Sequence, residues 1–476
     1  MSEKKINFGT AGWRGIIGDD FTFENVRIVS QSIAEYIKET TDSESPEIAV
    51  GYDTRFLSED FAKASSEVLA ANNIKVHYSD KDVPTPVVSS YIIDNKMCGG
   101  VNITASHNPP FYSGIKYSPY WGGPAMPEVT NKIEQKIKSL QKNPNKIKKI
   151  DFDLAKQKSI IEVADFSKTY MDRIKRKIDL ELIEKNVSLV FDAMYSTARS
   201  YMSDLLPNAK LKTINNYRDV LFGNRSPEPS EKYLSKMISI VRDEGYDIGI
   251  ATDGDADRFG IIDSDGSFIA PNQVLGLVMY HLSRKKYKGI GVRSVMTSSF
   301  IDAVGREVGV DVLETPVGFK YIGDIFTKQD IIVGGEESGG LTIGGHLPEK
   351  DGILACLLMA EIRAYEGKSI KDLLNELYQR VGCFVTERRN YVIGSEKMGF
   401  LRENLKKKLP DKIGGLKVEE VKTLDGYKFM FNQENSWLGL RFSGTEPLVR
   451  LYVESSSTRK VESILKSAEE IFKLKD

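Results

Sequence analysis

One serine and one group of aspartates carry the chemistry that this sequence predicts. Ser106 lies in the stretch Asn102-Ile103-Thr104-Ala105-Ser106-His107-Asn108-Pro109-Pro110, directly after a short apolar segment. The two prolines cannot continue a strand or a helix interior. We therefore expect Ser106 on an exposed, sharply turned loop at the end of a strand, where α/β proteins place reactive groups. Its hydroxyl becomes a nucleophile only when a partner removes or masks the proton.

An acidic stretch indicates which chemistry that serine performs. No Gly-x-Ser-x-Gly motif surrounds Ser106, so an acyl-transfer triad is not expected. The stretch Thr252-Asp253-Gly254-Asp255-Ala256-Asp257-Arg258 places three carboxylates at alternate positions. Such carboxylates can converge on one hard cation and leave a position open for a phosphate oxygen. A serine, a magnesium site and arginines together predict phosphoryl transfer through a phosphoserine.

The same acidic stretch resembles the beginning of a calcium-binding EF-hand loop. An EF-hand requires glycine at the sixth position of the loop and glutamate at the twelfth. Those positions hold Arg258 and Ser264 here, and we expect strands rather than helices on both sides. The EF-hand interpretation is therefore rejected, whereas a solvated acidic turn without a ligand stays open as an alternative.

Two glycine-containing loops carry groups that suit a phosphorylated sugar. Glu336 and Ser338, in Gly335-Glu336-Glu337-Ser338-Gly339, can hydrogen-bond sugar hydroxyls. The segment Arg441-Phe442-Ser443-Gly444-Thr445-Glu446-Pro447 combines a guanidinium, two hydroxyls and backbone amides in a candidate phosphate cradle. A polar hairpin loop has a similar composition, so neither loop is decisive alone.

Two residues near Ser106 are candidates for moving a proton or orienting a phosphate. Lys116 follows ten residues later, and a lysine beside other cations can have a lowered pKa and act as a base. His107 can orient the serine or the incoming phosphate. The alternatives are a surface lysine and a histidine that only caps the local turn.

Composition excludes several other classes of function. The chain has 476 residues, 66 basic and 67 acidic, which argues against a nucleic-acid partner because such proteins carry a basic face. No apolar run approaches the roughly 20 residues of a membrane helix, and the first residues lack the apolar region of a signal peptide. Three scattered cysteines, Cys98, Cys356 and Cys383, fit a reduced cytoplasm.

The elements that must position these residues alternate between strands and helices. A strand at Glu47–Tyr52 and a helix beginning at Pro271 are typical of this rhythm, which predicts mainly parallel, doubly wound sheets. After Val381 a two-residue alternation predicts a smaller, more antiparallel α+β domain. We place four domains at residues 1–150 (serine loop), 151–262 (metal loop), 263–380 (sugar loop) and 381–476 (phosphate loop).

Five stretches taken together resemble the α-D-phosphohexomutase superfamily, and within it the phosphoglucomutase/phosphomannomutase branch. They occur in the family's order along the whole chain: Gly9-Thr10-Ala11-Gly12-Trp13-Arg14-Gly15, Thr104–Pro110, Asp253–Arg258, Gly335–Gly339 and Arg441–Pro447. The resemblance implies a heart-shaped molecule with three related α/β domains and a mobile fourth, each lending one loop to a central cleft.

The resemblance also implies a role for each site residue. Ser106 would be phosphorylated, and Mg²⁺ would be held by Asp253, Asp255, Asp257 and a phosphate oxygen on Ser106. Lys116 would be the general base, with Arg14 and Arg258 steadying the transferring phosphate, and His107 would be a further catalytic residue that orients the serine or the phosphate. The phosphosugar would be bound by Gly318, Lys320, Glu336, Ser338, Lys350, Arg441, Ser443, Gly444 and Thr445.

The implied reaction interconverts hexose 1-phosphate and hexose 6-phosphate through glucose 1,6-bisphosphate or its analogue, in a monomer or homodimer. Glu336-Glu337-Ser338 resembles the phosphoglucomutase form of the sugar loop, but Val317 stands where phosphoglucomutases often have threonine. Glucose phosphate is the preferred prediction, and mannose or glucosamine phosphate is the alternative. A non-catalytic sugar-phosphate sensor is a more remote alternative, because none of the expected catalytic residues is missing.

Overall fold

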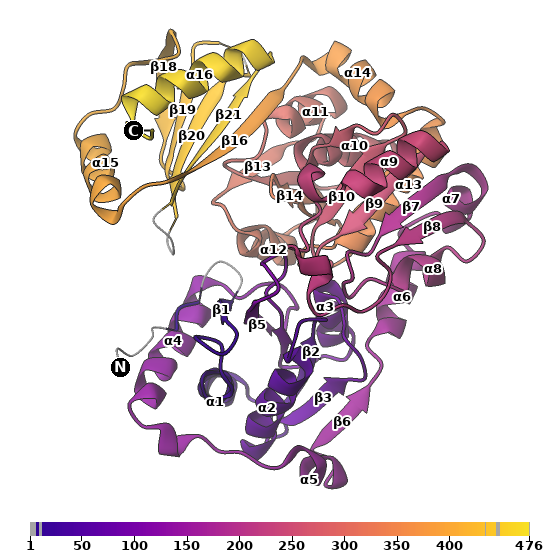
Figure 1. The fold of residues 1–476 in the computed structure, drawn as a ribbon, viewed down its shortest axis with the longest axis vertical. Coiled ribbons are helices and arrows are strands. Elements are labelled where there is room, and N and C mark those ends of the chain that lie inside the picture. The colour runs from indigo at the N-terminus through magenta and orange to yellow at the C-terminus, as the bar shows by residue number, and fades with distance from the viewer. Residues whose placement is uncertain (1–5, 9–11, 434, 444–447, 476) are drawn as a thin grey trace.

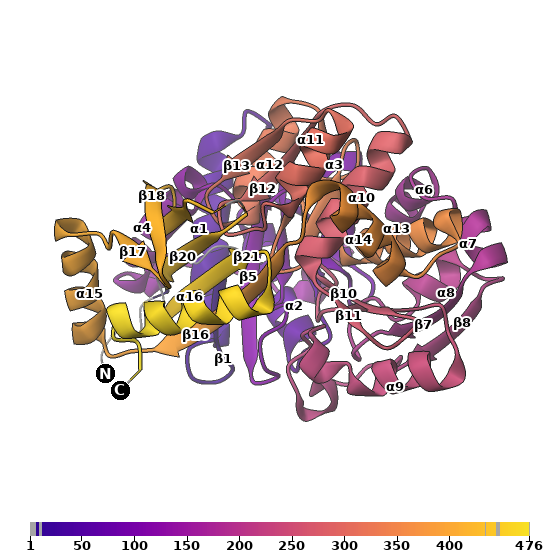
Figure 2. The same ribbon diagram turned by 90° about the horizontal axis from the view of Figure 1, so that it is seen from above.

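The computed structural model describes residues 6–8, 12–433, 435–443 and 448–475, and it forms four units, each built on its own sheet (Figure 1). Three units are α/β, and the fourth has a fully antiparallel sheet, so the predicted fold class is confirmed. Figure 2 shows helix α16 (Thr458–Ile471) lying across one face of that fourth sheet. No helix among the described residues has both the length and the apolar character needed to span a bilayer.

The first unit presents Ser106 at the end of a buried central strand. Its strands are β1 (Trp13–Ile16), β2 (Glu47–Tyr52), β3 (Lys75–Ser79), β4 (Gly99–Ile103), β5 (Tyr112–Pro119) and β6 (Ile161–Ala164). Its helices are α1 (Phe23–Thr40), α2 (Ser58–Ala71), α3 (Thr85–Asp94), α4 (Pro127–Gln141) and α5 (Phe152–Gln157). The sheet order is β1-β5-β4-β2-β3-β6, with β4 parallel to β2 and antiparallel to β5. Every residue of β4 is buried inside the first unit. The turn that follows β4 carries Ser106 and is therefore the part of this segment that can contact another unit.

The second unit presents the acidic stretch between two paired strands. Its strands are β7 (Ser188–Asp192), β8 (Lys210–Ile214), β9 (Ile248–Thr252), β10 (Phe259–Asp263) and β11 (Phe268–Ile269). Its helices are α6 (Ser167–Lys175), α7 (Leu180–Asn186), α8 (Tyr201–Leu205) and α9 (Ser235–Glu244). The order is β11-β10-β9-β7-β8, and β9 and β10 pair antiparallel directly across the acidic loop.

The third unit is a four-stranded sheet that ends in the glycine-rich loop. Its strands are β12 (Ile290–Ser294), β13 (Val312–Thr315), β14 (Ile331–Glu336) and β15 (Gly340–Ile343), in the order β13-β12-β14-β15. Its helices are α10 (Pro271–Arg284), α11 (Phe300–Val308), α12 (Phe319–Lys328), α13 (Gly352–Glu366) and α14 (Ile370–Val381). The hairpin from β14 to β15 carries Glu336 and Ser338.

The fourth unit carries the candidate phosphate cradle. Its strands are β16 (Val385–Val392), β17 (Lys412–Ile413), β18 (Leu416–Lys422), β19 (Tyr427–Phe431), β20 (Trp437–Phe442) and β21 (Leu448–Ser455). They lie in the order β16-β21-β20-β19-β18-β17, and α15 (Ser395–Lys407) and α16 complete the unit. The cradle lies between β20 and β21, which pair antiparallel.

Two predicted domain boundaries were wrong. β6 pairs parallel with β3, so residues 152–164 complete the first sheet rather than begin the second unit. β11 pairs with β10 after the turn that follows Asp263, so the second unit continues to Ile269. A short strand at a sheet edge has little hydrophobic pattern of its own, and only its partner shows where it belongs.

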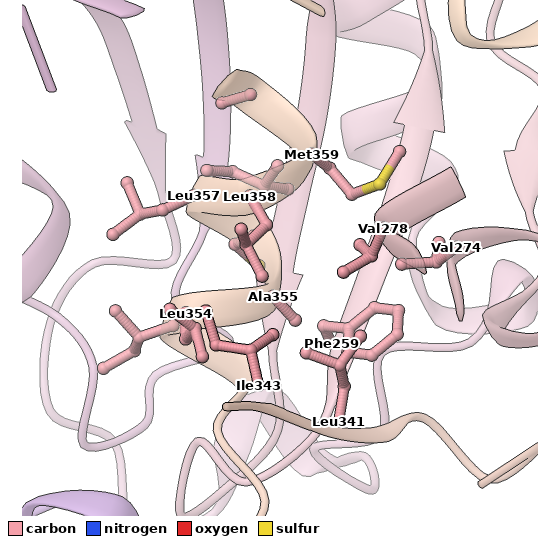
Figure 3. Close-up of a cluster of buried hydrophobic side chains, with 14 of the residues drawn as sticks. Phe259, Val274, Val278, Leu341, Ile343, Leu354, Ala355, Leu357, Leu358 and Met359 are labelled. Carbon is pink, nitrogen blue, oxygen red and sulfur yellow. The ribbon is translucent and has the colours of Figure 1, made fainter. Parts of the chain in front are cut away.

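The second and third units share one hydrophobic core, which α13 joins. Figure 3 shows Ala355 and Met359 of α13 facing Phe259 of β10 and Val278 of α10. All four side chains are almost fully buried. Burying a side chain such as valine or phenylalanine stabilises the fold by about 1.5–3 kcal/mol. This shared packing fixes the acidic loop and the glycine-rich loop relative to each other.

Candidate active site

Ser106 is buried against the second unit, with only 1% of its surface exposed, so the prediction of an exposed loop hydroxyl was wrong. Its Oγ donates a hydrogen bond of 2.6 Å to Oδ2 of Asp253. The backbone at Ser106 has φ 51°, a left-handed conformation that a residue other than glycine adopts at a cost of about 1–3 kcal/mol. Its N–H is held by the hydroxyl of Thr104 at 2.9 Å.

The acidic loop folds back on itself so that its three carboxylates face one point. Asp253 Oδ1 accepts the backbone N–H groups of Asp257 and Arg258 at 2.9 and 3.0 Å. Candidate ligand oxygens of Asp253, Asp255 and Asp257 lie within 4.8 Å of one another, and all three residues are buried. The loop turns through Ala256, which has φ 55°. The predicted convergence of the three carboxylates is therefore confirmed in the structure.

The donor set of this cluster fits a hard divalent cation. Oδ1 of Asp255 and Oδ1 of Asp257 are buried and have no hydrogen-bond partner among the described residues. An unpartnered buried carboxylate oxygen carries a large desolvation cost. Mg²⁺ prefers such oxygens and usually keeps other positions for water or a substrate phosphate. The unpartnered oxygens of Asp255 and Asp257, beside the carboxylate of Asp253, therefore make this cluster a candidate metal site.

Lys116 and Lys350 neutralise the acidic loop in this arrangement. Lys116 Nζ donates to Asp255 Oδ2 at 2.6 Å and to Asp257 Oδ2 at 2.8 Å, and Lys350 Nζ donates to Asp257 Oδ2 at 2.8 Å. Burial lowers the pKa of Lys116, but the carboxylates of Asp255 and Asp257 outweigh burial and raise it. The lowered pKa expected for this lysine was thus wrong for the arrangement seen here, because its closest charges are anions.

The carboxylates respond in opposite directions to the same surroundings. Burial, and then the charges of Asp257 and Asp255, raise the pKa of Asp253. Burial would also raise the pKa of Asp257, but Lys116, Lys350 and Arg258 hold it well below its usual range. Asp257 is therefore ionised, whereas a negative charge on Asp253, the carboxylate next to Ser106, is disfavoured.

Two arginines, Arg14 and Arg258, and one histidine, His107, complete the surroundings of Ser106. Arg14 Nη1 donates to Asn108 Oδ1 at 2.6 Å, which ties β1 to the serine loop. His107 Nδ1 lies 3.4 Å from Ser106 Oγ, and its pKa is lowered well below the usual value by burial, Arg258 and Arg14. The imidazole is therefore neutral. Arg258 Nε is buried and has no partner among the described residues, so it is available to an anion.

The third unit places its sugar loop next to this cluster. Glu336 Oε1 accepts the backbone N–H of Gly318 at 2.7 Å, and Gly318 has φ 130°, which favours glycine. Burial, followed by the neighbouring Glu337, raises the pKa of Glu336 to about 7, while Lys350 and Arg258 act in the opposite direction. The same two cations therefore act on both Glu336 and the acidic loop. Ser338 and Arg258 line a shared cavity of about 220 Å³.

The fourth unit reaches the third unit through Asp425, which Arg441 holds in place. Arg441 Nε donates to Asp425 Oδ2 at 3.1 Å, and the same oxygen accepts the backbone N–H of Val317 at 3.1 Å. Burial lowers the pKa of Lys320, while Glu128 and Asp425 act in the opposite direction. Ser443 is buried at the end of the described part of the loop. The predicted contacts of Gly444 and Thr445 lie outside the described residues.

Sequence reasoning missed three residues that support these groups. Thr85 Oγ1 donates to Asp255 Oδ2 at 2.6 Å and accepts from Asn102 Nδ2 at 2.9 Å, so it fixes one metal-site carboxylate. Arg55 donates hydrogen bonds to backbone oxygens of the loop that carries Ser106. Asp425 accepts the backbone N–H of Val317. None of the three belongs to a recognisable local motif, since each acts on a residue far away in the chain.

Gly254 allows the acidic loop to touch the serine loop, and we expect Gly254→Ala to impair turnover. A Cβ at this position would lie 2.4 Å from the backbone oxygen of Ser106, so one loop must move. A displacement of that size at reacting groups lowers kcat by about 10- to 100-fold. Steady-state kinetics would measure the effect, with Gly399→Ala as the control because a Cβ there meets nothing within 4 Å. Unchanged kcat in Gly254→Ala would contradict the contact between the loops.

Comparison with known proteins identifies the family of the four units. Family profiles of phosphoglucomutase/phosphomannomutase match the chain as alpha/beta/alpha domain I at residues 5–144, domain II at 168–266, domain III at 270–381 and the C-terminal domain at 400–471. A phosphoglucomutase/phosphomannomutase of Thermococcus kodakarensis is 32% identical over 472 residues, covering 96% of each chain.

Two further relatives carry different substrate names. A protein of Methanobrevibacter smithii assigned as a phosphoglucosamine mutase is 30% identical and covers 99% of both chains. The crystal structure of a protein of Thermus thermophilus assigned as a phosphomannomutase has a TM-score of 0.85, 32% identity and 99% coverage of both chains. The matches thus agree on the protein family and differ on the sugar.

These matches assign the four units to the mutases, isomerases that move a phosphoryl group within a sugar phosphate. The chain belongs to the phosphoglucomutase/phosphomannomutase family of the α-D-phosphohexomutase superfamily. The predicted family and enzyme class are therefore confirmed.

Proposed function

We propose that this enzyme interconverts hexose 1-phosphate and hexose 6-phosphate through a phosphoserine at Ser106, with glucose phosphate as the preferred substrate. The observation that carries the proposal is the 2.6 Å hydrogen bond from Ser106 Oγ to Asp253, inside the carboxylate cluster. Lys116, Lys350, Arg14 and Arg258 surround this pair with positive charge, as a phosphoryl group requires.

Mg²⁺ would be held by Asp253, Asp255 and Asp257, together with a phosphate oxygen on Ser106. The ion would neutralise charge on the transferring phosphoryl group. Arg258, with its unpartnered Nε, and Arg14 would bind the remaining phosphoryl oxygens. The buried position of Ser106 would protect a phosphoserine from water.

The transfer breaks the bond between phosphorus and Ser106 Oγ and forms a bond between phosphorus and a hydroxyl oxygen of the hexose phosphate. The hydroxyl proton needs an acceptor, and Lys116 is the buried amine next to the cluster. Its pKa is raised by Asp255 and Asp257, so it can accept a proton only when the negative charge on those carboxylates is neutralised. Neutral His107 would orient the serine oxygen.

The remaining groups would hold the sugar during both half-reactions. Glu336 and Ser338 would bind two sugar hydroxyls. Gly318, Lys320 and Lys350 would line the same part of the substrate site. Arg441, Ser443, Gly444 and Thr445 would hold the phosphate that does not react. The 1,6-bisphosphate formed in the first transfer must then turn round, so that its other phosphate faces Ser106. Glucose 1,6-bisphosphate would therefore also act as an activator that phosphorylates the resting enzyme.

A substrate panel tests the proposal most simply. The 1-phosphates of glucose, mannose and glucosamine would be assayed with Mg²⁺ and a catalytic amount of the matching 1,6-bisphosphate. We expect the highest kcat/KM with glucose 1-phosphate. A preference for mannose or glucosamine 1-phosphate would select one of the alternative mutases, and no turnover with any of them would favour the sugar-phosphate sensor.

Glu336 predicts a pH dependence of substrate binding. Its pKa of about 7 lies above the ordinary value, so the carboxylate that accepts sugar hydroxyls is fully charged only above this pH. As the pH falls from 8 to 6, protonation should raise KM, beyond the change caused by the substrate's own phosphate. Glu336→Gln should have a KM about tenfold higher at pH 8, because a charge-assisted hydrogen bond contributes about 1.5–3 kcal/mol.

The control for this experiment is a glutamate that pairs on the surface. Glu366 binds Arg284 far from the site, and Glu366→Gln should keep the wild-type dependence of KM on pH. The same dependence of KM on pH in Glu336→Gln and wild type would show that Glu336 does not bind the sugar.

A further inference from the structure

Arg55, just after β2, is a completely buried arginine whose five N–H donors are all used. Nε donates to Asp53 Oδ2 at 3.0 Å. Nη1 donates to the backbone oxygens of Pro109 and Tyr112 at 2.7 and 3.1 Å, and Nη2 donates to those of Ser106 and Asn108 at 2.6 and 2.7 Å. A guanidinium has five donors in a fixed plane. None of them is left for a phosphate oxygen.

The four backbone oxygens belong to one loop, residues 106–112, which we call the serine loop. One planar group therefore ties four of its peptide units together, including that of Ser106. The left-handed φ of 51° at Ser106 needs surroundings that hold it in place. The backbone oxygen of Ser106 also receives the close approach of Gly254 from the acidic loop. Arg55 thus fixes the atom against which the metal loop packs.

Arg55 is itself held from two sides. Asp53 Oδ1 accepts the Arg55 backbone N–H at 3.0 Å and the Ser58 hydroxyl at 2.7 Å, so the carboxylate cannot rotate freely. The guanidinium carbon lies 5.0 Å from the centre of the Phe222 ring, a buried side chain of the second unit. A cation is attracted to the face of an aromatic ring, most strongly when both groups are desolvated. The contact joins the serine loop to the unit that carries the aspartates.

We infer that Arg55 is a positioning residue for phosphoryl transfer, which sets the serine loop against the acidic loop and does not bind phosphate. This inference rests on the proposed role of Ser106. Arg14 and Arg258 differ from Arg55, because they face the histidine and the carboxylates of the site. A lysine in place of Arg55 retains the charge but has three donors on a tetrahedral nitrogen, so it cannot bind the same set of oxygens.

The test is Arg55→Lys in the full-length enzyme with Mg²⁺. We expect kcat to fall by about 10- to 100-fold through misplacement of the serine, with KM within about threefold of wild type because no phosphate contact is lost. Hydrogen exchange of the amides of residues 104–113 should become faster, while exchange in the fourth unit stays unchanged. Arg363→Lys is the matched control, since Arg363 is a half-buried arginine that pairs with Asp247 away from the site.

A second variant keeps the inference testable if Arg55→Lys does not fold. Phe222→Leu removes the ring beneath the guanidinium but none of its hydrogen bonds, and we expect it to lower kcat by about three- to tenfold with unchanged KM. A large rise in KM in Arg55→Lys would show a phosphate ligand and overturn the inference. The inference would also be overturned if both Arg55→Lys and Phe222→Leu had the wild-type kcat and the wild-type rate of amide exchange in the serine loop. Full turnover by Ser106→Ala would instead overturn the proposed function. Hydrogen exchange of the amides of the serine loop would still test whether Arg55 positions that loop.

Discussion

Ser106→Ala should reduce turnover by at least about 10⁴-fold, because it removes the oxygen that would carry the phosphoryl group between the two half-reactions. The remaining groups can bind substrate but offer no second acceptor at the same place. The lost hydrogen bond to Asp253 should cost about 1–3 kcal/mol of stability. The variant should nevertheless stay folded, because three further units stabilise the chain around this loop. Circular dichroism and thermal melting would verify this.

Ser113→Ala is the matched control for this prediction. Ser113 is a buried serine on β5, seven residues further along, and its hydroxyl has no hydrogen-bond partner among the described residues. Its replacement should leave kcat within about twofold of wild type. Comparable activity of Ser106→Ala and Ser113→Ala would exclude a phosphoserine at Ser106.

Asp255→Asn should lower the affinity for Mg²⁺ by about 100-fold and reduce kcat in parallel. The replacement removes the charge on one of the two buried carboxylates that have an unpartnered oxygen. Removal of the metal from wild type by a chelator should have the same effect on turnover, and added Mg²⁺ should restore it. Titration calorimetry would give the affinity. Thermal melting offers a second readout, since a ligand at 100 times its Kd stabilises the fold by about 2.7 kcal/mol.

Asp265→Asn is the control for the acidic loop. Asp265 is a surface aspartate that pairs with Lys371, and exposed ion pairs of this kind contribute about 0–1 kcal/mol. Its replacement should change neither metal affinity nor kcat. Equal stabilisation of Asp255→Asn and wild type by Mg²⁺ would show that the ion binds elsewhere.

Local motifs were enough to predict the family and most of the fold. The motifs of the serine and of the aspartates lie far apart in the chain, and the structure brings Asp253 to Ser106 although 147 residues separate them. β2 and the beginning of α10 were predicted at their observed positions because their apolar pattern and their proline are strong local signals.

The supporting residues could not be predicted, because their partners are set by tertiary structure. Thr85 acquires its role only when the second unit docks on the first. Arg55 acquires its role only when residues 106–112 fold over its guanidinium. The lowered pKa predicted for Lys116 was wrong for the same reason. The sequence indicated other cations near this lysine, but not that its amine would contact the carboxylates of Asp255 and Asp257. Edge strands such as β6 were misplaced because a few residues carry too weak a pattern.

The fourth unit is attached to the third through a smaller apolar cluster than the one that joins the second and third units. Its contacts with the third unit are partly polar: Glu454 accepts the backbone N–H of Ser299 at 3.1 Å, and Lys428 donates to the oxygen of Val295 at 2.7 Å. They also include a small apolar cluster, in which Val295 and Met296 pack against Trp437 and Tyr452. The second and third units share a much larger apolar core. The metal loop and the sugar loop are therefore held together, while the phosphate loop is carried on a separate sheet.

Mapping the phosphoryl group through one turnover tests the phosphoserine most directly. Dephosphorylated enzyme would be mixed with glucose 1,6-bisphosphate and Mg²⁺, digested, and examined by peptide mass spectrometry before and after addition of glucose 1-phosphate. We predict one phosphoryl group per chain on the peptide that contains Ser106, lost to the sugar at a rate no slower than kcat. A phosphoryl group on another residue, or one that stays on Ser106 throughout turnover, would contradict the proposed mechanism.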